Sequence, residues 1–293
     1  VISNCAFQGN TGMWIRLYSY GNDITSNVFA NSSISLSGVD DNRVIGNIIA
    51  NSSGVGVDLS NSHNNVIARN NVINNTQGGI SLSVSGGNVI SGNTIEHNGW
   101  YTLDTYEFIM GGLSLSESNT NTIRQNNISG NRYGIITRQS NNNVFYHNNF
   151  INNTHQLYDP SWDPWYPGAT STNTWDDGYP SGGNFWSNYT GVDLYSGADQ
   201  DQQGSDGVGD ALHIIDAYNW DRYPLMAPYR PLSVTWNGKT YSLDVSSNST
   251  ITEFSFSQSA KSISFNVGGP NGTAGFCNVT IPKELLDASP WEW

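Results

Sequence analysis

Residues 65–75 read NVIARNNVINN, and residues 143–153 read NVFYHNNFINN. In both stretches an Asn lies between two apolar residues at matching distances. Related stretches recur through the first half of the chain at intervals of about 20 to 23 residues, with one longer interval. The copies begin at Asn22, Asn42, Asn65, Asn88, Asn121 and Asn143, and residues 1–10 are a further copy without its first residue. A repeat of this length predicts a solenoid of stacked units.

The aligned copies contain columns of similar residues. One apolar column is Ile2, Ile24, Val44, Ile67, Ile90, Ile123 and Phe145, and another is Phe7, Phe29, Ile49, Val72, Ile95, Ile128 and Phe150. Between them lies a column of Cys5, Asn27, Asn47, Asn70, Asn93, Asn126 and Asn148. A further short segment in each copy alternates apolar and polar residues, as in Ile80 and Leu82, which is typical of a strand.

These patterns predict an all-β fold, a right-handed parallel β-helix of about seven coils over residues 1–154. The period is too short for helix pairs, and the leucine-rich pattern of a horseshoe is missing. We expect the stacked Asn side chains to hydrogen-bond along the rod, and the Asn residues themselves to adopt left-handed backbone angles. Cys5 and Cys277 lie in different units, so we expect two free thiols.

The repeat ends near Thr154, and two further regions follow. Residues 155–230 are rich in Trp, Pro, Asp and Gly, which predicts an irregular segment that caps the open end of the rod. Residues 231–293 contain Asn237-Gly238 between two strand-like runs, a strong hairpin signal. We expect a small β-sandwich-like domain there, truncated at Trp293.

The net charge of −13, with 24 acidic residues against 11 basic ones, argues against nucleic-acid binding. Carboxylates interleaved with Gly in the capping segment suggest a structural Ca²⁺ site, because Ca²⁺ takes six to eight oxygen ligands. The candidate ligands are Asp193, Asp199, Asp201, Asp206, Asp210 and Asp216. The spacing is not that of an EF-hand, and a solvated acidic loop or a cluster of Asx turns is the alternative.

Aromatic residues outside the repeat are candidates for stacking on sugars. They are Trp100, Tyr101, Trp162, Trp165, Tyr166 and Trp175. Trp100 and Tyr101 belong to an insertion between two copies, and insertions in solenoids usually project as loops. The alternative is that these aromatic side chains cover the rod or fill the cap.

Asn-x-Ser/Thr sequons are frequent, and we expect some to carry glycans. The candidates are Asn31, Asn74, Asn152, Asn188, Asn248, Asn271 and Asn278. Asn31, Asn51 and Asn74 fall in one turn column, so glycans on all three successive coils would crowd one another.

The sequence resembles NosD-like β-helix proteins of the carbohydrate-binding and sugar-hydrolase type, through the N-x-I-x-x-N-x-I copies. Residues 173–228, with GGNFWSNYTGVDLYSG and DRYPLMAP, resemble a segment that follows such helices in archaeal surface proteins. The last sixty or so residues resemble a module that usually precedes a membrane anchor. The resemblance implies an extracellular or cell-surface location and a chain that continues to an anchor. The family name implies copper delivery, but the five His and three Met are few and scattered.

Three functions remain open at this point. The sequence favours a non-catalytic surface protein that self-associates into a sheath or filament, and the alternative is polysaccharide binding or processing, with cell-envelope glycans as partners. We assign no catalytic residues. Arg69, Gln125 and His147 share an outward column, but Arg69 and His147 are three coils, roughly 14 Å, apart.

Overall fold

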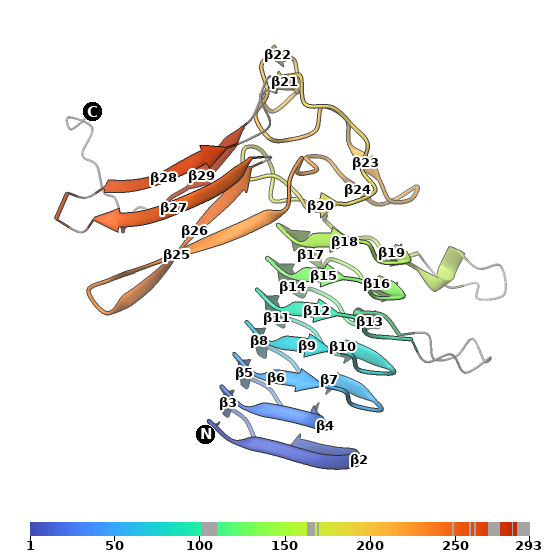
Figure 1. Ribbon diagram of the computed structural model, residues 1–293. Coiled ribbons are helices and arrows are strands. Elements are labelled where there is room, and N and C mark those ends of the chain that lie inside the picture. The colour runs from blue at the N-terminus through green and yellow to red at the C-terminus, as the bar shows by residue number, and fades with distance from the viewer. Residues whose placement is uncertain are drawn as a thin grey trace.

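The computed structural model describes residues 1–100, 110–162, 168, 170–247, 249–257, 259–260, 262–268, 276–282 and 284–285, with the backbone alone at some of these positions. A rod of stacked coils is followed by an irregular cap and by two small antiparallel sheets (Figure 1). The rod and the strands confirm the predicted all-β fold, a right-handed parallel β-helix. The described part of the chain contains no helix with the length and apolar character that a membrane crossing demands.

One face of the rod is a seven-stranded parallel sheet that takes one short strand from each coil. Its strands are β1 (Ile2–Ser3), β3 (Asp23–Thr25), β5 (Arg43–Ile45), β8 (Val66–Ala68), β11 (Val89–Ser91), β14 (Thr122–Arg124) and β17 (Val144–Tyr146). Ile24 pairs with Ile2 of the preceding coil and with Val44 of the following one. The first apolar column of the sequence is therefore a column of register partners.

The remaining faces form a 13-stranded sheet. Its strands are β2 (Ala6–Leu17), β4 (Val28–Ser37), β6 (Ile48–Ala50), β7 (Val55–Ser60), β9 (Asn71–Ile73), β10 (Gly78–Ser83), β12 (Thr94–Glu96), β13 (Leu113–Ser116), β15 (Asn127–Ser129), β16 (Tyr133–Arg138), β18 (Asn149–Ile151), β19 (His155–Tyr158) and β20 (Phe185–Trp186). The long strand β4 joins two faces by pairing with both β6 and β7. Ile80 pairs with Val57 and Leu113, as the alternating pattern predicts.

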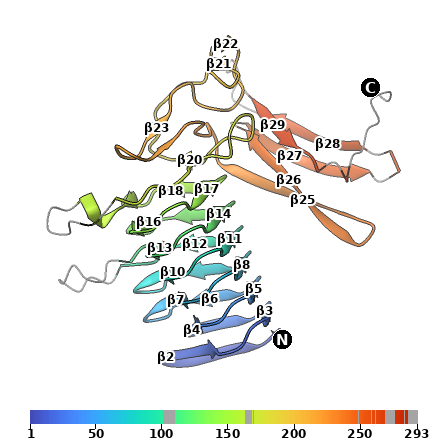
Figure 2. The same cartoon turned by 180° about the vertical axis from the view of Figure 1, so that it is seen from behind.

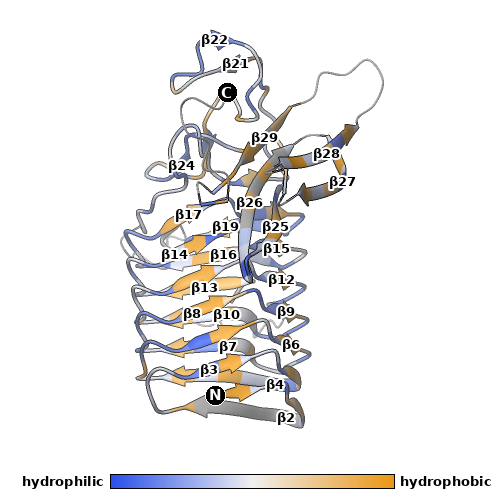
Figure 3. Cartoon of the chain, turned by 90° about the vertical axis from the view of Figure 1, so that its left-hand side faces the viewer, coloured by the Kyte–Doolittle hydropathy of each residue, from blue (hydrophilic) through white to orange (hydrophobic). Residues whose placement is uncertain are grey.

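The apolar columns form one continuous core along the rod. Ile67, Val72 and Ile80 are 0% exposed, and the same cluster reaches Trp175 and Trp186 at the capped end. Apolar residues lie on the strands while the connecting turns are hydrophilic (Figure 3). No single coil can bury its apolar side chains alone, so each coil depends on its neighbours.

Asn side chains form hydrogen-bonded ladders inside the rod. The Nδ2 of Asn70 donates to Oδ1 of Asn93 at 3.0 Å, and the backbone N–H of Asn70 donates to the same oxygen at 2.9 Å. Nδ2 of Asn70 also donates to the Val44 carbonyl in the preceding coil at 2.8 Å. This confirms the predicted stacking and satisfies polar groups that burial would otherwise leave unpaired.

The structure contains further ladders besides the one predicted. The predicted ladder through Asn70 and Asn93 is the first. The second joins Asn22, Asn42, Asn65, Asn88, Asn121, Asn143 and Asn173. The third runs from Ser52 through Asn75, Asn98, Asn131 and Asn153. The fourth, a serine ladder, links Ser62, Ser85, Ser118, Ser140 and Ser171 through backbone N–H donors.

The prediction that the ladder Asn residues adopt left-handed angles is wrong. Positive φ falls one residue earlier, at Ser26 (58°), Arg69 (54°) and His147 (55°), with Gly46 and Gly92 at the same turn of other coils. The left-handed residue turns the chain so that the following Asn side chain points inward. Arg69, Gln125 and His147 therefore share a column, as predicted, at a backbone turn.

A column of glycines lies beside the third ladder. A Cβ at Gly79 would lie 2.8 Å from Cγ2 of Ile95 and closer still to the carbonyl oxygen of Gly112. Gly56, Gly112 and Gly134 meet equivalent obstacles from the next coil. Strands β7, β10, β13 and β16 can approach the ladder only because these positions lack side chains.

The cap ends the ladders with acceptors. The cap contains η2 (Pro160–Trp162), β21 (Tyr195–Ser196), β22 (Gln202–Gln203), β23 (His213–Ile214) and β24 (Trp220–Asp221). Asn184 extends the first ladder beyond Asn148, and the carboxylate of Asp221 then accepts the backbone N–H of Asn184 at 2.7 Å. The same oxygen accepts the indole N–H of Trp186 at 2.9 Å. Asp159 ends the serine ladder by accepting from Ser171.

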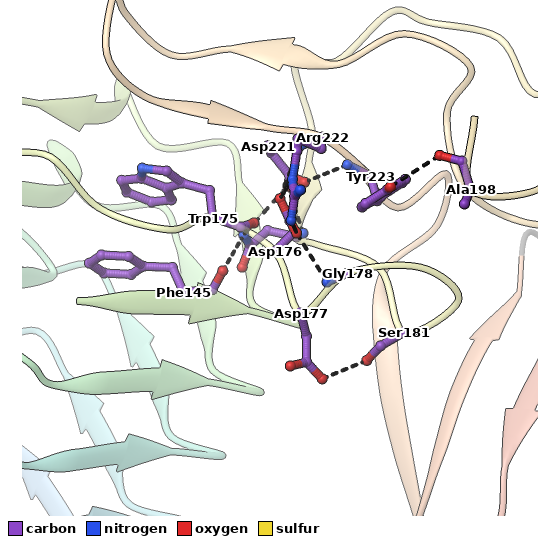
Figure 4. Close-up of polar contacts among 11 residues, drawn as sticks. Phe145, Trp175, Asp176, Asp177, Gly178, Ser181, Ala198, Asp221, Arg222 and Tyr223 are labelled. Atoms are coloured by element: carbon purple, nitrogen blue, oxygen red, sulfur yellow. Dashed lines mark hydrogen bonds and ion pairs between the residues drawn. The ribbon is translucent and has the colours of Figure 1, made fainter. Parts of the chain in front are cut away.

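Asp221 is fully buried and lies beside the ion pair of Asp176 with Arg222 (Figure 4). Burial, its largest influence, raises the pKa of Asp221 from 3.8 to about 7, while N–H donors from Trp186, Asn184 and Tyr223 act in the opposite direction. Gly183 packs against this carboxylate so closely that a Cβ would overlap it. The cap is thus organised around a buried acid.

The C-terminal strands form two antiparallel sheets with a small shared core. The strands are β25 (Tyr229–Trp236), β26 (Lys239–Ser247) and β29 (Cys277–Thr280) in one sheet, and β27 (Thr250–Ser257) and β28 (Ser262–Gly268) in the other. The hairpin predicted at Asn237-Gly238 joins β25 to β26. Tyr229 anchors this region, because its ring stacks on His147 at 4.6 Å and its hydroxyl accepts from Gln125 at 2.8 Å.

Candidate functional site

A pocket of about 340 Å³ lies where the last coil meets the cap. Its lining comprises residues 153–157 around β19, Trp186 and Asn188 beyond β20, and residues 213–215 around β23. The site therefore combines residues more than fifty positions apart, which the rod and the cap bring together (Figure 2). The volume is within the lower part of the range of small-ligand sites, roughly 300–1,000 Å³.

The wall from the last coil carries the imidazole of His155, which belongs to a group of stacked rings. His155 stacks on Tyr133 of the preceding coil, with ring centroids 5.0 Å apart, and Tyr158 lies 5.2 Å from Tyr133. The guanidinium of Arg132 lies 5.4 Å from the Tyr133 ring. The register of β16 and β19 brings these rings together, and His155 is the member of the group that lines the pocket.

An amide network fixes the pocket floor. Nδ2 of Asn153 donates to Oε1 of Gln156 at 2.8 Å, and Nε2 of Gln156 donates to Oγ of Ser187 at 2.9 Å. Asn153 is the last Asn of the third ladder, so the rod itself orients the Gln156 amide. Two-sided bonding holds this side chain in one orientation before any ligand arrives.

The cap wall carries a second imidazole. The ring centroid of His213 lies 4.7 Å from that of Trp186 and 5.8 Å from that of Tyr189. Burial lowers the pKa of His213, so the neutral imidazole is its form at neutral pH. A neutral imidazole offers one donor and one acceptor.

These groups suit binding through hydrogen bonds and aromatic contact. The described lining residues include amides, imidazoles and an indole, and none of them is Asp or Glu. That composition stands out in a chain with 24 acidic residues. Glycoside hydrolysis commonly uses a pair of carboxylates, and this pocket lining does not supply one.

The predicted aromatic platform is only partly described, and one member is wrong. Trp100 is 54% exposed, as a platform requires, but it does not line the pocket. Trp175 is 1% exposed, since it stacks on Phe145 at 4.2 Å and closes the core of the last coil. Its indole N–H donates to Asn219. Tyr101, Trp165, Tyr166 and the side chain of Trp162 lie outside the described residues.

The carboxylates predicted to bind Ca²⁺ bond mainly to backbone N–H groups. Asp193 accepts from Asp206 and Gly207, and Asp210 accepts from Leu194 and Tyr195. Asp206 and Asp216 also accept backbone N–H groups, at Val208 and Tyr218. Asp199 and Asp201 are exposed. Asp206 and Asp216 therefore form Asx turns, whereas Asp193 and Asp210 link distant segments of the cap, and Ca²⁺ binding stays a prediction.

The sequons lie where accessible side chains are expected. Asn31, Asn74, Asn152 and Asn188 are exposed, and the first three occupy the same kind of left-handed turn. Asn248, Asn271 and the side chain of Asn278 lie outside the described residues. Glycosylation itself stays a prediction.

Sequence reasoning missed the pocket residues. Gln156 and His213 lie in segments where the repeat has ended, and no spacing relates them. The one usable signal was the Asn at position 153, since a ladder that ends there requires another acceptor.

Fold and site together define a capped parallel β-helix protein with a pocket at its capped end. Residues 1–191 match the model of a family described as periplasmic copper-binding protein (NosD). The chain belongs to the NosD family, as the resemblance implied, and it is accordingly an extracytoplasmic protein. Comparison with curated protein sequences finds no match.

Copper does not fit the residues present. Within the part of the chain that the structure describes, no three or more His, Cys, Asp and Glu side chains gather in a group able to hold a metal ion. His155 and His213 share the pocket without a thiolate or thioether among its lining residues. We therefore derive no function through copper.

Several solved structures are similar at low identity. The periplasmic alginate epimerase AlgG shares 19% identity over 59% of this chain and 42% of that one, with a TM-score of 0.44. An alginate lyase from Paenibacillus sp. str. FPU-7 shares 14% over 61% of this chain and 77% of that one, with a TM-score of 0.31. Tailspike protein 2 of Escherichia coli O157:H7 bacteriophage CAB120 shares 12% over 97% and 46%, with a TM-score of 0.42. The chain spans under half of the epimerase, and these likenesses carry no functional argument.

Proposed function

We propose that the protein binds a polysaccharide through the pocket between the last coil and the cap. The observation that carries the proposal is the lining of this pocket, in which an amide fixed by the third ladder lies together with two imidazoles. Sugars present hydroxyl groups and apolar C–H faces, which amides, imidazoles and aromatic rings complement. The proposal is binding and not turnover, because the described lining lacks a carboxylate pair.

A glycan array followed by calorimetry tests this function. The array should include neutral oligosaccharides and oligosaccharides of uronic acids, because the imidazoles and nearby Arg132 also tolerate an anionic sugar. We expect Gln156→Ala and His213→Ala to weaken binding at least tenfold. Gln77→Ala and His97→Ala, at exposed sites on the rod, are the matched controls. Equal affinity in all four variants, each with a thermal unfolding curve showing that it folds, would contradict the proposal.

The finer expectations concern location and assembly. An archaeal cell surface, a C-terminal anchor and a sheath or filament stay predictions, and polysaccharide binding has the better support because a formed pocket backs it. Electron microscopy of the native protein, with and without a Ca²⁺ chelator, tests assembly. Ordered filaments would restore the structural role, and their loss on chelation would support the Ca²⁺ prediction.

A further inference from the structure

The β23–β24 hairpin has two faces of different character. His213 pairs with Asp221, and these side chains pack into the cap, where Asp221 ends the first ladder. Ile214 pairs with Trp220 one position along, on the opposite face. Alternation along a strand places the second pair outward whenever the first pair is inward.

The outward face exposes large apolar side chains. Ile214 is 70% exposed, Trp220 is 44% exposed, and Tyr218 in the connecting turn is 61% exposed. Single exposed apolar residues are ordinary, but neighbouring ones form a patch that mostly marks an interaction site. The turn beneath them is well ordered by hydrogen bonds, because Asp216 accepts from Tyr218 and from Asn219.

This patch adjoins the pocket. Ile214 lines the pocket and is also the register partner of Trp220. Directly opposed residues in an antiparallel pair have Cβ atoms roughly 5 Å apart. The indole of Trp220 therefore lies one side chain beyond the pocket edge, on the cap side.

We infer that Trp220, with Tyr218, forms a second sugar subsite that receives the residue adjoining the one held in the pocket. This inference rests on the proposed function and specifies its ligand as an oligosaccharide or polysaccharide rather than a free monosaccharide. The subsite contributes apolar contact and the pocket contributes hydrogen bonds. A pyranose ring packs its C–H face on an exposed indole and keeps its hydroxyls in water.

The position of Trp220 in the cap allows its side chain to be removed without disturbing the fold. Its side chain lies on the outer face, whereas the indoles of Trp175 and Trp186 are buried in the core and donate to Asn219 and Asp221. Truncating Trp220 should therefore leave the ladders and the core intact. Truncating either buried indole would not.

The test measures affinity against chain length. The probes are cello-oligosaccharides and oligogalacturonates of one to four sugar residues, titrated by calorimetry into the full chain. For at least one series we expect affinity to rise about tenfold between one and three sugar residues. Trp220→Ala should abolish this rise while leaving the affinity for the single sugar within twofold of the unmodified protein.

Trp100→Ala is the matched control, because Trp100 is an exposed indole away from the pocket. It should leave the rise unchanged. An unchanged rise in Trp220→Ala overturns the subsite, and so does an equal loss in both variants. Binding that requires Gln156 but shows no length dependence also overturns it and leaves the proposed function standing. Absence of binding in both probe series, and on the glycan array, overturns both.

Discussion

The rod and the cap solve the same problem in different ways. In the rod, inward polar groups donate to the side-chain oxygen at the equivalent position of the next coil, as Asn70 does to Asn93 and Asn93 to Asn126. The cap must accept the hydrogen bonds of the last ladder residues without a further coil to continue the ladder. It does so with side chains that occur once, such as Asp221 and Asp159.

The difference shows where information about the structure resides. In the rod the same sequence pattern recurs in each coil and specifies the strand register, the core and the ladders. In the cap each acceptor depends on a loop that brings it back to the rod, and the pocket arises as a by-product of that return. Variants in the two regions should therefore differ in how much stability they lose and in how that loss depends on pH.

Asn93→Ala should produce the largest loss of stability. Asn93 donates to Asn126 and to the Ile67 carbonyl, and it accepts from the backbone and side chain of Asn70. Leaving these buried partners unpaired should lower the free energy of unfolding by about 5 kcal/mol. Urea denaturation measures this, with Asn71→Ala, at an exposed site next to the ladder, as a control that should change little.

Asp221→Asn should remove a pH dependence that belongs to the cap. The pKa of Asp221 is raised from 3.8 to about 7, so the folded chain holds this proton more tightly than the unfolded one. The resulting stability is fully present below pH about 4 and is lost as the pH rises through about 7. Each pKa unit corresponds to 1.36 kcal/mol, so the loss is up to about 4 kcal/mol.

Urea denaturation of both proteins from pH 4 to 8 isolates this contribution as a difference. His213 remains in both and acts oppositely, because its lowered pKa costs stability as the pH falls. Asp176 and Arg222, which also face Asp221, are likewise unchanged. A parallel pH profile in the two proteins would show that Asp221 stays ionised throughout, as its N–H donors favour.

Gly79→Ala should cost about 3 kcal/mol, because its Cβ would meet Ile95 and the Gly112 carbonyl and force the coils apart. Gly54→Ala is the control on the same rod, with Ser52 Oγ at 3.9 Å as the nearest obstacle. Thermal unfolding distinguishes the two. Equal melting temperatures would mean that the glycine column has no packing role.

Tyr229→Phe should have the smallest effect, about 1 kcal/mol. The change removes the hydroxyl that accepts from Gln125 but keeps the ring stacked on His147. Because Tyr229 anchors the C-terminal sheets, we expect faster proteolysis near residues 228–230 without a shift in the unfolding of the rod. A loss as large as that of Gly79→Ala would instead place Tyr229 in the core of the rod.

The rod could be predicted from sequence because each coil repeats the same constraint, so Ile67 or Asn70 is identified by its column alone. The Gly residues at 56, 79, 112 and 134 also form a column, but the need for Gly there becomes clear only from the neighbouring ladder and coil that a Cβ would meet. The burial of Trp175 could not be predicted, because outside the repeat nothing in the sequence distinguishes an exposed Trp from one in the core. The pocket could not be predicted either, since Gln156 and His213 meet only through the path of the cap.

The ladders also give the rod a direction. In the first ladder the side-chain oxygens face the first coil and the backbone N–H groups face the cap, where the carboxyl group of Asp221 accepts the last of them. The aligned amides therefore resemble the parallel dipoles of a helix, with a hydrogen-bond acceptor placed at the positive end. A coil can therefore be added to this rod in one orientation only, with its side-chain oxygens turned toward the N–H groups of the coil before it.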